Sequence, residues 1–270
     1  MKIILNSTEL KKELKNNHNI GFVPTMGSIH KGHEYLILRS KKVCRKTLVS
    51  IYVNPTQFDN KKDLRNYPKN IKKDLSLLKN LNVDYVFIPK TNDIYKQKKI
   101  KRIRLKITDK ILCAKFRKGH FEGVLNVMDR LIKIISPNKV FMGEKDFQQY
   151  YLVKKFFKHN SKIKVIKCKT IRTKNKVALS SRNFLLSKKN IFVAEKVIKE
   201  LFKLKKKISK SIRVNQYLTS VKKDLIQKYK IKIEYLEIRN VNNLKKSNFI
   251  KNSKIFIAYY LDDIRLIDNL

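Results

Sequence analysis

Short runs of Val, Ile and aromatic residues alternate with helical patterns through the first 170 or so residues, and this alternation constrains the fold more than any other feature. The apolar runs are "NIGFVP" (19–24), "TLVSIYVN" (47–54), "VDYVFIP" (83–89), "KVFMG" (139–143) and "IKVIKCKTI" (163–171). Between them, "HEYLILRSKKVC" and "DLSLLKNLN" repeat apolar residues at i, i+3 and i+4, as amphipathic helices do. This alternation predicts a parallel sheet covered on both faces, with ligands bound at the carboxyl ends of its strands.

The pattern changes after about residue 186. Two amphipathic helical stretches, "NIFVAEKVIKELFKLKKKI" and "VNQYLTSVKKDLIQKY", precede two strand-like runs, "IKIEYLEIRN" and "SKIFIAYYL". We therefore predict an α/β fold, with a Rossmann-like parallel sheet in an N-terminal domain (1–176) and a smaller α+β C-terminal domain (177–270). The Lys-rich stretch "YKQKKIKRIRLK" (95–106) resembles a solvated loop or an edge strand.

The formal net charge of +44 raises the possibility of a nucleic-acid partner. The excess is mostly Lys, however, and it is spread along the chain together with Ile and Asn, whose codons are also rich in A and T. Genome base composition explains this pattern better, so we expect no nucleic-acid partner. A positive field would still attract anionic substrates.

No stretch approaches the roughly 18 apolar residues that a membrane span needs, and the apolar run in "MKIILNSTELKKEL" is too short for a signal peptide. These features predict a cytoplasmic protein with no membrane partner. The cysteines, Cys44, Cys113 and Cys168, stand far apart and are expected to be reduced thiols.

The stretch "PTMGSIHKGH" reads as a strand end, a turn and a helix start. Gly27 permits an unusual turn, and Gly32 lets the backbone approach a ligand. His30 and His33 project on the same side of the helix start, where free N–H groups would bind phosphate and imidazoles could donate protons. Surface histidines on a turn are one alternative interpretation. A His-x-x-His zinc pair is another, although Cys or carboxylate partners are missing at nearby spacing.

Further motifs decide between these interpretations. With "VPTMGSIHKGH", "VSIYVNPTQF", "FRKGHFEGV", "FMGEKDFQQ" and "LSSRN" in this order, the chain resembles the pantoate–β-alanine ligase (pantothenate synthetase) family of the HxGH nucleotidyltransferase superfamily. The resemblance covers nearly the full length, since "YLEIRN" and "IRLIDNL" also look like that family's second domain. It implies an ATP-dependent ligation in which pantoate is adenylated and β-alanine then displaces AMP.

The resemblance also implies roles for individual residues. His33 would be the proton donor, with His30 and Lys145 on the phosphates, Gly143 and Asp146 near the ribose and Ile171 at the adenine. The full set of residues implied in ATP binding is Met26, Gly27, Ser28, Ile29, His30, Lys31, Gly32, His33, Gly143, Glu144, Lys145, Asp146, Ile171, Leu179, Ser180, Ser181 and Arg182.

Gln57 and Gln149 would bind pantoate, because amides can donate to a carboxylate and accept from hydroxyls. We infer that Pro24, Met26 and Phe58 wall the methyl groups of pantoate. Magnesium is expected with ATP, held mostly by phosphate oxygens and water, with Asp74 a weak candidate ligand. A homodimer and a C-terminal lid over the nucleotide are also expected from the family.

Arg117 and His120 in "FRKGHFEGV" are expected near the phosphates, with helix capping as the alternative for His120. The chain departs from the family pattern at Lys69, Lys118 and Lys176, where Arg, Pro and Gly are usual. These changes are toward lysine, as the base-composition explanation predicts.

Three other functions are weighed against the ligase. Another HxGH-type adenylyltransferase would not need both "NPTQF" and "KDFQQ", and a tRNA synthetase would need a large anticodon-binding region. A basic nucleic-acid-binding protein would be expected to cluster Arg and aromatic residues on one face.

Overall fold

The computed structural model describes residues 1–95, 103–208 and 214–270. The chain forms two compact units, Met1–Ile171 and Arg172–Leu270. We predicted a boundary after residue 176. Residues 172–176 lie in the second unit because the Arg172 guanidinium donates to both carboxylate oxygens of Asp268 at 2.6 and 2.8 Å. Most of the Lys-rich stretch at 95–106 lies outside the described residues.

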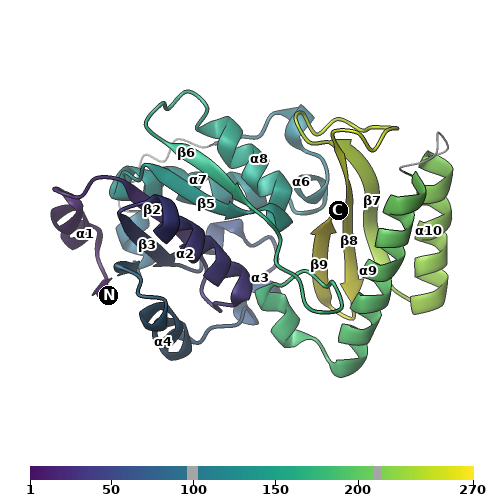
Figure 1. Cartoon of the computed structure of the whole chain (residues 1–270), viewed down its shortest axis with the longest axis horizontal. Coiled ribbons are helices and arrows are strands. Elements are labelled where there is room, and N and C mark those ends of the chain that lie inside the picture. The colour runs from purple at the N-terminus through teal and green to yellow at the C-terminus, as the bar shows by residue number, and fades with distance from the viewer. Residues whose placement is uncertain (96–102, 209–213) are drawn as a thin grey trace. The chain divides into compact units, whose positions relative to one another are not determined.

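The first unit is built on a parallel sheet whose strand order is β1-β4-β3-β2-β5-β6 (Figure 1). The strands are β1 (Lys2–Ile4), β2 (Ile20–Thr25), β3 (Lys46–Ile51), β4 (Tyr85–Phe87), β5 (Lys139–Gly143) and β6 (Lys164–Cys168). This architecture confirms the predicted parallel α/β fold. The edge strand β1 was not predicted, because three residues are too few to show a period.

Helices cover both faces of this sheet. They are α1 (Ser7–Leu14), α2 (Lys31–Val43), α3 (Lys61–Arg65), α4 (Ile71–Asn80), α5 (Thr91–Ile94), α6 (Cys113–Phe116), α7 (His120–Ile135) and α8 (Phe147–Phe156), with 3-10 turns η1 (Pro55–Gln57), η2 (Ile107–Asp109) and η3 (Glu144–Asp146).

One face carries α2 and α4, whose Ile37 and Leu78 pack against Val23, Val49 and Phe141 of the strands. Since side chains alternate along a strand, Phe22 and Val140 point to the opposite face. Both are fully buried there. That face carries α7, which packs against α1 and α8 (Figure 1).

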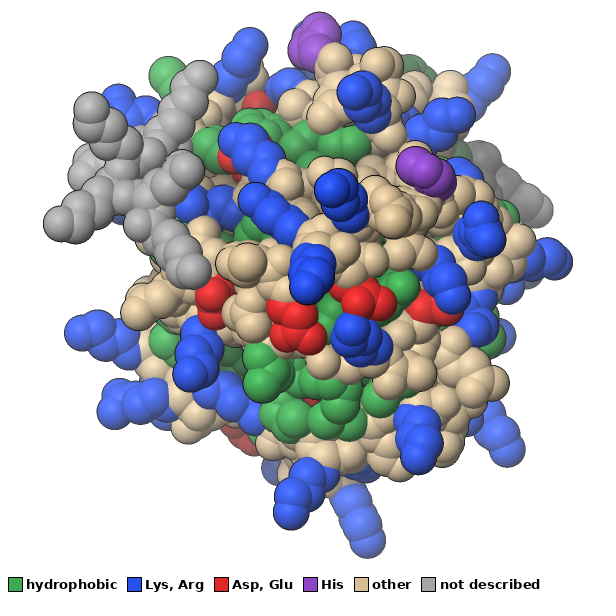
Figure 2. All heavy atoms as spheres, turned by 90° about the vertical axis from the view of Figure 1, so that its left-hand side faces the viewer, with side chains coloured by type: hydrophobic (Ala, Val, Ile, Leu, Met, Phe, Trp, Pro, Cys, Tyr) green, Lys and Arg blue, Asp and Glu red, His purple; other side chains and the backbone are tan. Residues whose placement is uncertain are grey.

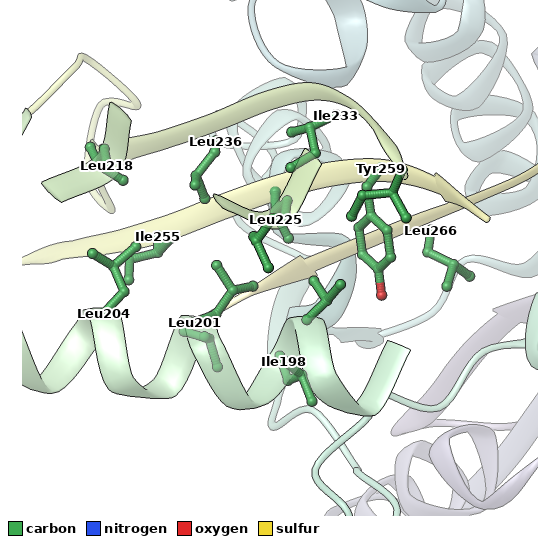
Figure 3. Close-up of a cluster of buried hydrophobic side chains, with 14 of the residues drawn as sticks. Ile198, Leu201, Leu204, Leu218, Leu225, Ile233, Leu236, Ile255, Tyr259 and Leu266 are labelled. Atoms are coloured by element: carbon green, nitrogen blue, oxygen red, sulfur yellow. The ribbon is translucent and has the colours of Figure 1, made fainter. Parts of the chain in front are cut away.

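The second unit joins two helices to an antiparallel sheet of order β7-β8-β9. Its elements are η4 (Ser181–Leu185), α9 (Lys188–Ile208), α10 (Val214–Tyr229), β7 (Lys232–Asn240), β8 (Ser253–Leu261) and β9 (Ile264–Asn269). Leu201 and Leu204 of α9 point toward Ile255 and Leu236 of the sheet (Figure 3). The predicted α+β character of this region is confirmed.

The basic side chains are dispersed over the face of the molecule that Figure 2 shows. On the face shown in Figure 2, Lys and Arg are scattered among acidic, apolar and other groups and do not form one continuous patch. The cysteines Cys44, Cys113 and Cys168 are free and buried. Every helix within residues 1–95, 103–208 and 214–270 is too short or too polar to cross a bilayer.

A glycine in α7 controls how closely this helix approaches η1. A Cβ on Gly123 would lie 2.3 Å from the carbonyl oxygen of Thr56 and 2.8 Å from the Cα of Gln57. Replacing a helical glycine by alanine ordinarily stabilises a helix by about 1 kcal/mol. Here the methyl group meets backbone that cannot rotate away.

We therefore expect Gly123→Ala to lower the free energy of unfolding by about 1–3 kcal/mol, the usual cost of overpacking. Urea unfolding measures the change, with Ser76→Ala on the exposed side of α4 as the control, expected within about 0.5 kcal/mol of the parent. A Gly123→Ala protein more stable than the parent would contradict this packing.

Candidate active site

The loop after β2 lies where the strand order reverses. The chain leaves β2 for β3 on one side, while β5 pairs with β2 on the other. In open α/β sheets this switch point forms a crevice at the carboxyl ends of the strands. The loops after β2 and β5, which carry "MGSIHKGH" and "GEKD", both lie at this edge.

The loop after β2 has an unusual backbone. Gly27 and Ser28 have φ of 81° and 55°, so two consecutive residues are left-handed. The N–H groups of Ser28 and Ile29 donate to the two carboxylate oxygens of Asp74 at 2.8 and 2.7 Å. A side chain of the chain itself therefore occupies these two N–H groups.

His30 caps α2. Its Nδ1 accepts a hydrogen bond from the Gly32 N–H at 3.0 Å. A Cβ on Gly32 would lie 2.7 Å from the His30 ring, so glycine is needed for this close approach. Because Nδ1 is the acceptor, the proton of the neutral ring resides on Nε2.

His30 and His33 stack with ring centroids 4.1 Å apart. Burial lowers the pKa of His30 to about 4, with a further lowering by the charge of Lys145 against an opposing effect of Asp146. Burial, followed by His30 and Lys145, also holds the pKa of His33 well below its usual range. Within the described part of the chain, Nδ1 of His33 is buried without a hydrogen-bond partner. Such a polar atom often marks a binding site.

The turn after β5 supplies the nearby cation. Lys145, in η3, has a side chain only 16% exposed, and its Nζ lies 3.5 Å from Asp146 Oδ1. Its positive charge lowers the pKa of both histidines. Glu144 is instead paired with Lys167 at 2.9 Å. Two neutral imidazoles beside a lysine can together donate hydrogen bonds to an anion and offset its charge.

Gln57 lies in η1, after β3, and is buried. Its Oε1 accepts from Asn54 Nδ2 at 3.2 Å, while its Nε2 lies 2.8 Å from Met26 Sδ. The amide donor is thereby directed toward the loop after β2. Sequence reasoning missed Asn54, whose available signal was the Asn-Pro pair that caps η1. Gln149, the second predicted amide, lies half-buried in the first turn of α8.

Arg117 and His120 hold the segment around Gln57. Arg117 Nε donates to Asp59 Oδ1 at 2.9 Å, and Nη1 lies 3.0 Å from His120 Nε2. Since a guanidinium only donates, His120 Nε2 accepts and Nδ1–H donates to the Gln57 carbonyl at 2.5 Å. Gly119 is the N-cap residue of α7, so neither of these His120 bonds is a helix cap.

The predicted residues Leu179, Ser180, Ser181 and Arg182 lie in the second unit, around η4. The Ser180 N–H donates to Asn183 Oδ1 at 2.6 Å, and Ser181 is buried. Ile171 is the last residue of the first unit. The structure thus brings together predicted residues of the loops after β2 and β3, while those around η4 belong to the second unit.

The residues that could hold a metal ion are few. Across residues 1–95, 103–208 and 214–270, no three His, Cys, Asp or Glu side chains are grouped as metal ligands. Asp74 is only 2% exposed and both its oxygens accept backbone N–H groups. A protein cage for Mg²⁺ does not fit this arrangement, whereas a cation held by ligand phosphates and water does not need one.

The strand order, the helices on both faces and the loops at the switch point define a doubly wound parallel α/β protein with a smaller α+β unit. The family model of pantoate-beta-alanine ligase matches residues 2–270. The chain therefore belongs to the pantoate–β-alanine ligase family.

Individual relatives agree over the whole chain. Pantothenate synthetases of Pseudothermotoga lettingae and Endomicrobium trichonymphae are 37% and 38% identical to it, with all of this chain and 98% and 97% of theirs covered. The crystal structure of pantothenate synthetase from Thermus thermophilus is similar with a TM-score of 0.94 at 28% identity, covering 100% of this chain and 99% of that one. Pantoate-beta-alanine ligase from Francisella tularensis, complexed with beta-gamma ATP and beta-alanine, has a TM-score of 0.84 at 34% identity, covering 100% and 97%.

The neutrality of His30 can be tested directly. Its folded pKa of about 4 lies below the unfolded value of about 6.5, so between these values the unfolded chain binds a proton that the folded chain does not. The folded protein is therefore most stable, with respect to this group, above about pH 6.5, and it loses stability as the pH falls toward 4.

We expect ¹⁵N NMR at pH 7 to show neutral His30 with its proton on Nε2. The fall in the urea midpoint between pH 7 and pH 5 should be smaller in His30→Gln than in the parent. An imidazolium spectrum for His30 at pH 7, or equal falls in the two proteins, would contradict the geometry.

Proposed function

We propose that the chain joins pantoate to β-alanine at the expense of ATP, in two steps. Its membership in the ligase family and the ATP-related and β-alanine ligands of the Francisella relative support this reaction. The observation that carries the proposal is the stacked pair of neutral histidines beside Lys145 at the switch point.

In the first step, a pantoate carboxylate oxygen attacks the α-phosphorus of ATP and the bond to pyrophosphate breaks. Negative charge then grows on the leaving pyrophosphate. Nε2–H of His30, an N–H of His33 and the Lys145 ammonium would donate hydrogen bonds to those oxygens, with His33 in the position of the family's proton donor. Neutral imidazoles suit this role because they donate without requiring a proton from solvent at pH 7.

Four segments of the chain would hold the nucleotide. The loop residues Met26–His33 and the turn Gly143–Asp146 would hold phosphates and ribose, with Ile171 at the adenine. The turn residues Leu179–Arg182 would bind phosphate oxygens, in the manner of a mobile lid that excludes water from the adenylate. Mg²⁺, held by phosphate oxygens and water, would neutralise part of the triphosphate charge.

Pantoate would bind between the amides of Gln57 and Gln149. The Nε2 of Gln57 donates one N–H to Met26 Sδ, and its second N–H can donate to the pantoate carboxylate. Pro24, Met26 and Phe58 would form apolar walls for its methyl groups. This arrangement would hold the carboxylate near the α-phosphate, which supplies much of the rate of a two-substrate reaction.

In the second step, the amine of β-alanine attacks the acyl carbon of pantoyl adenylate. The C–O bond to AMP breaks, the amine loses a proton, and pantothenate and AMP leave. Adenylation is needed because a free carboxylate would have to expel oxide, whereas AMP is a good leaving group. We further propose that the enzyme is cytoplasmic and works as a homodimer.

We expect His33→Ala and Lys145→Ala to lower pantoate-dependent release of pyrophosphate from ATP by about 10²–10³-fold, the usual loss when an electrostatic donor is removed. Both variants should remain folded by circular dichroism. Lys133→Ala is the matched control, because Lys133 is an exposed lysine paired with Asp129 on α7. Normal activity of either site variant would overturn the assignment.

A further inference from the structure

A buried carboxylate underlies the loop that carries the histidines. Asp74, in the first turn of α4, is 2% exposed and lies 45 and 46 residues along the chain from its two partners, Ile29 and Ser28. Each of its oxygens accepts one backbone N–H, at 2.7 and 2.8 Å. These are charge-assisted hydrogen bonds, which are stronger than those between neutral groups.

The backbone that Asp74 holds is strained. Gly27 adopts a left-handed φ without cost, but Ser28 at φ 55° does not. In this turn the successive N–H groups of Ser28 and Ile29 point to one side, as in the anion-binding concavities of other proteins. In this protein a side chain of the chain itself occupies that concavity.

The loop also fits tightly on the carboxylate. A Cβ on Gly27 would lie 2.9 Å from Asp74 Oδ2 and 3.1 Å from Ile51 Cγ2. The next residue after Ile29 is His30, which caps α2 through Gly32 and stacks on His33. The positions of both rings therefore depend on a backbone fixed immediately before them.

We propose that Asp74 is a positioning residue for adenylate formation, acting through the N–H groups of Ser28 and Ile29, and that it is not a metal ligand. The inference rests on the proposed function, in which His30 and His33 act on the departing pyrophosphate. Loss of the carboxylate should thus impair the step that expels pyrophosphate much more than the step that expels AMP.

The test is Asp74→Asn, which keeps the size but turns an NH₂ group toward one of the two N–H donors. Single-turnover pyrophosphate release from ATP and pantoate should fall by on the order of 10²-fold, as for other misplaced catalytic groups. The rate at which chemically prepared pantoyl adenylate reacts with β-alanine on the enzyme should change by less than about threefold. The half-saturating Mg²⁺ concentration should stay the same. An unchanged first step, equal losses in both steps, or recovery with excess Mg²⁺ would overturn the proposal.

Asp84→Asn is the matched control. Asp84 also accepts a backbone N–H, that of Thr47 at 2.8 Å, and it pairs with Lys46 at the amino end of β3, away from the site. Its variant should lose stability without the difference between the two steps. If Asp74→Asn does not fold, Gly27→Ala tests the same contact, because its methyl group displaces the loop from an intact carboxylate. It should show the same unequal loss, and equal losses would count against the proposal.

Failure of the proposed function would give a different result. In that case the parent protein itself would release no pyrophosphate with pantoate. The proposal on Asp74 is decided only by comparing variants with an active parent.

Discussion

The parallel pairing of β2 with β5 is the constraint on which the site depends. Gly21 and Phe22 pair with Lys139 and Val140, while the chain leaves β2 toward β3 on the other side. The loops after β2 and β5 consequently end beside each other, although more than a hundred residues separate them. This pairing brings His30 and His33 close to Lys145, and no local interaction could do so.

The chemistry of the site follows from burial next to a positive charge. An imidazole in water would be partly protonated at neutral pH, but desolvation and Lys145 keep both histidines neutral. The Gly32 N–H then leaves His30 with its proton on Nε2. The site therefore presents two neutral donors and one cation, a combination suited to charge that develops on a phosphate oxygen.

The sequence predicted those features that have a local signal. The central strands, α2, α9 and α10 follow hydrophobic periods, and the HxGH and GEKD motifs locate the loops at the switch point. It did not predict how the loop after β2 is held, because Asp74 is distant in sequence and a lone Asp in a helix has no distinctive pattern. Two further contacts were missed for the same reason. Asn54 orients Gln57, and Arg117 and His120 bond to the segment around Gln57. The placement of η4 residues on ATP remains a prediction from the family.

The most direct test of the central claim follows an oxygen atom. Pantoate labelled with ¹⁸O in both carboxylate oxygens is converted with ATP and β-alanine, and the products are analysed by mass spectrometry. If pantoate attacks the α-phosphorus and β-alanine then displaces AMP, each AMP carries one labelled oxygen and pyrophosphate carries none. Label in inorganic phosphate with formation of ADP, or AMP without label, would contradict the adenylate route.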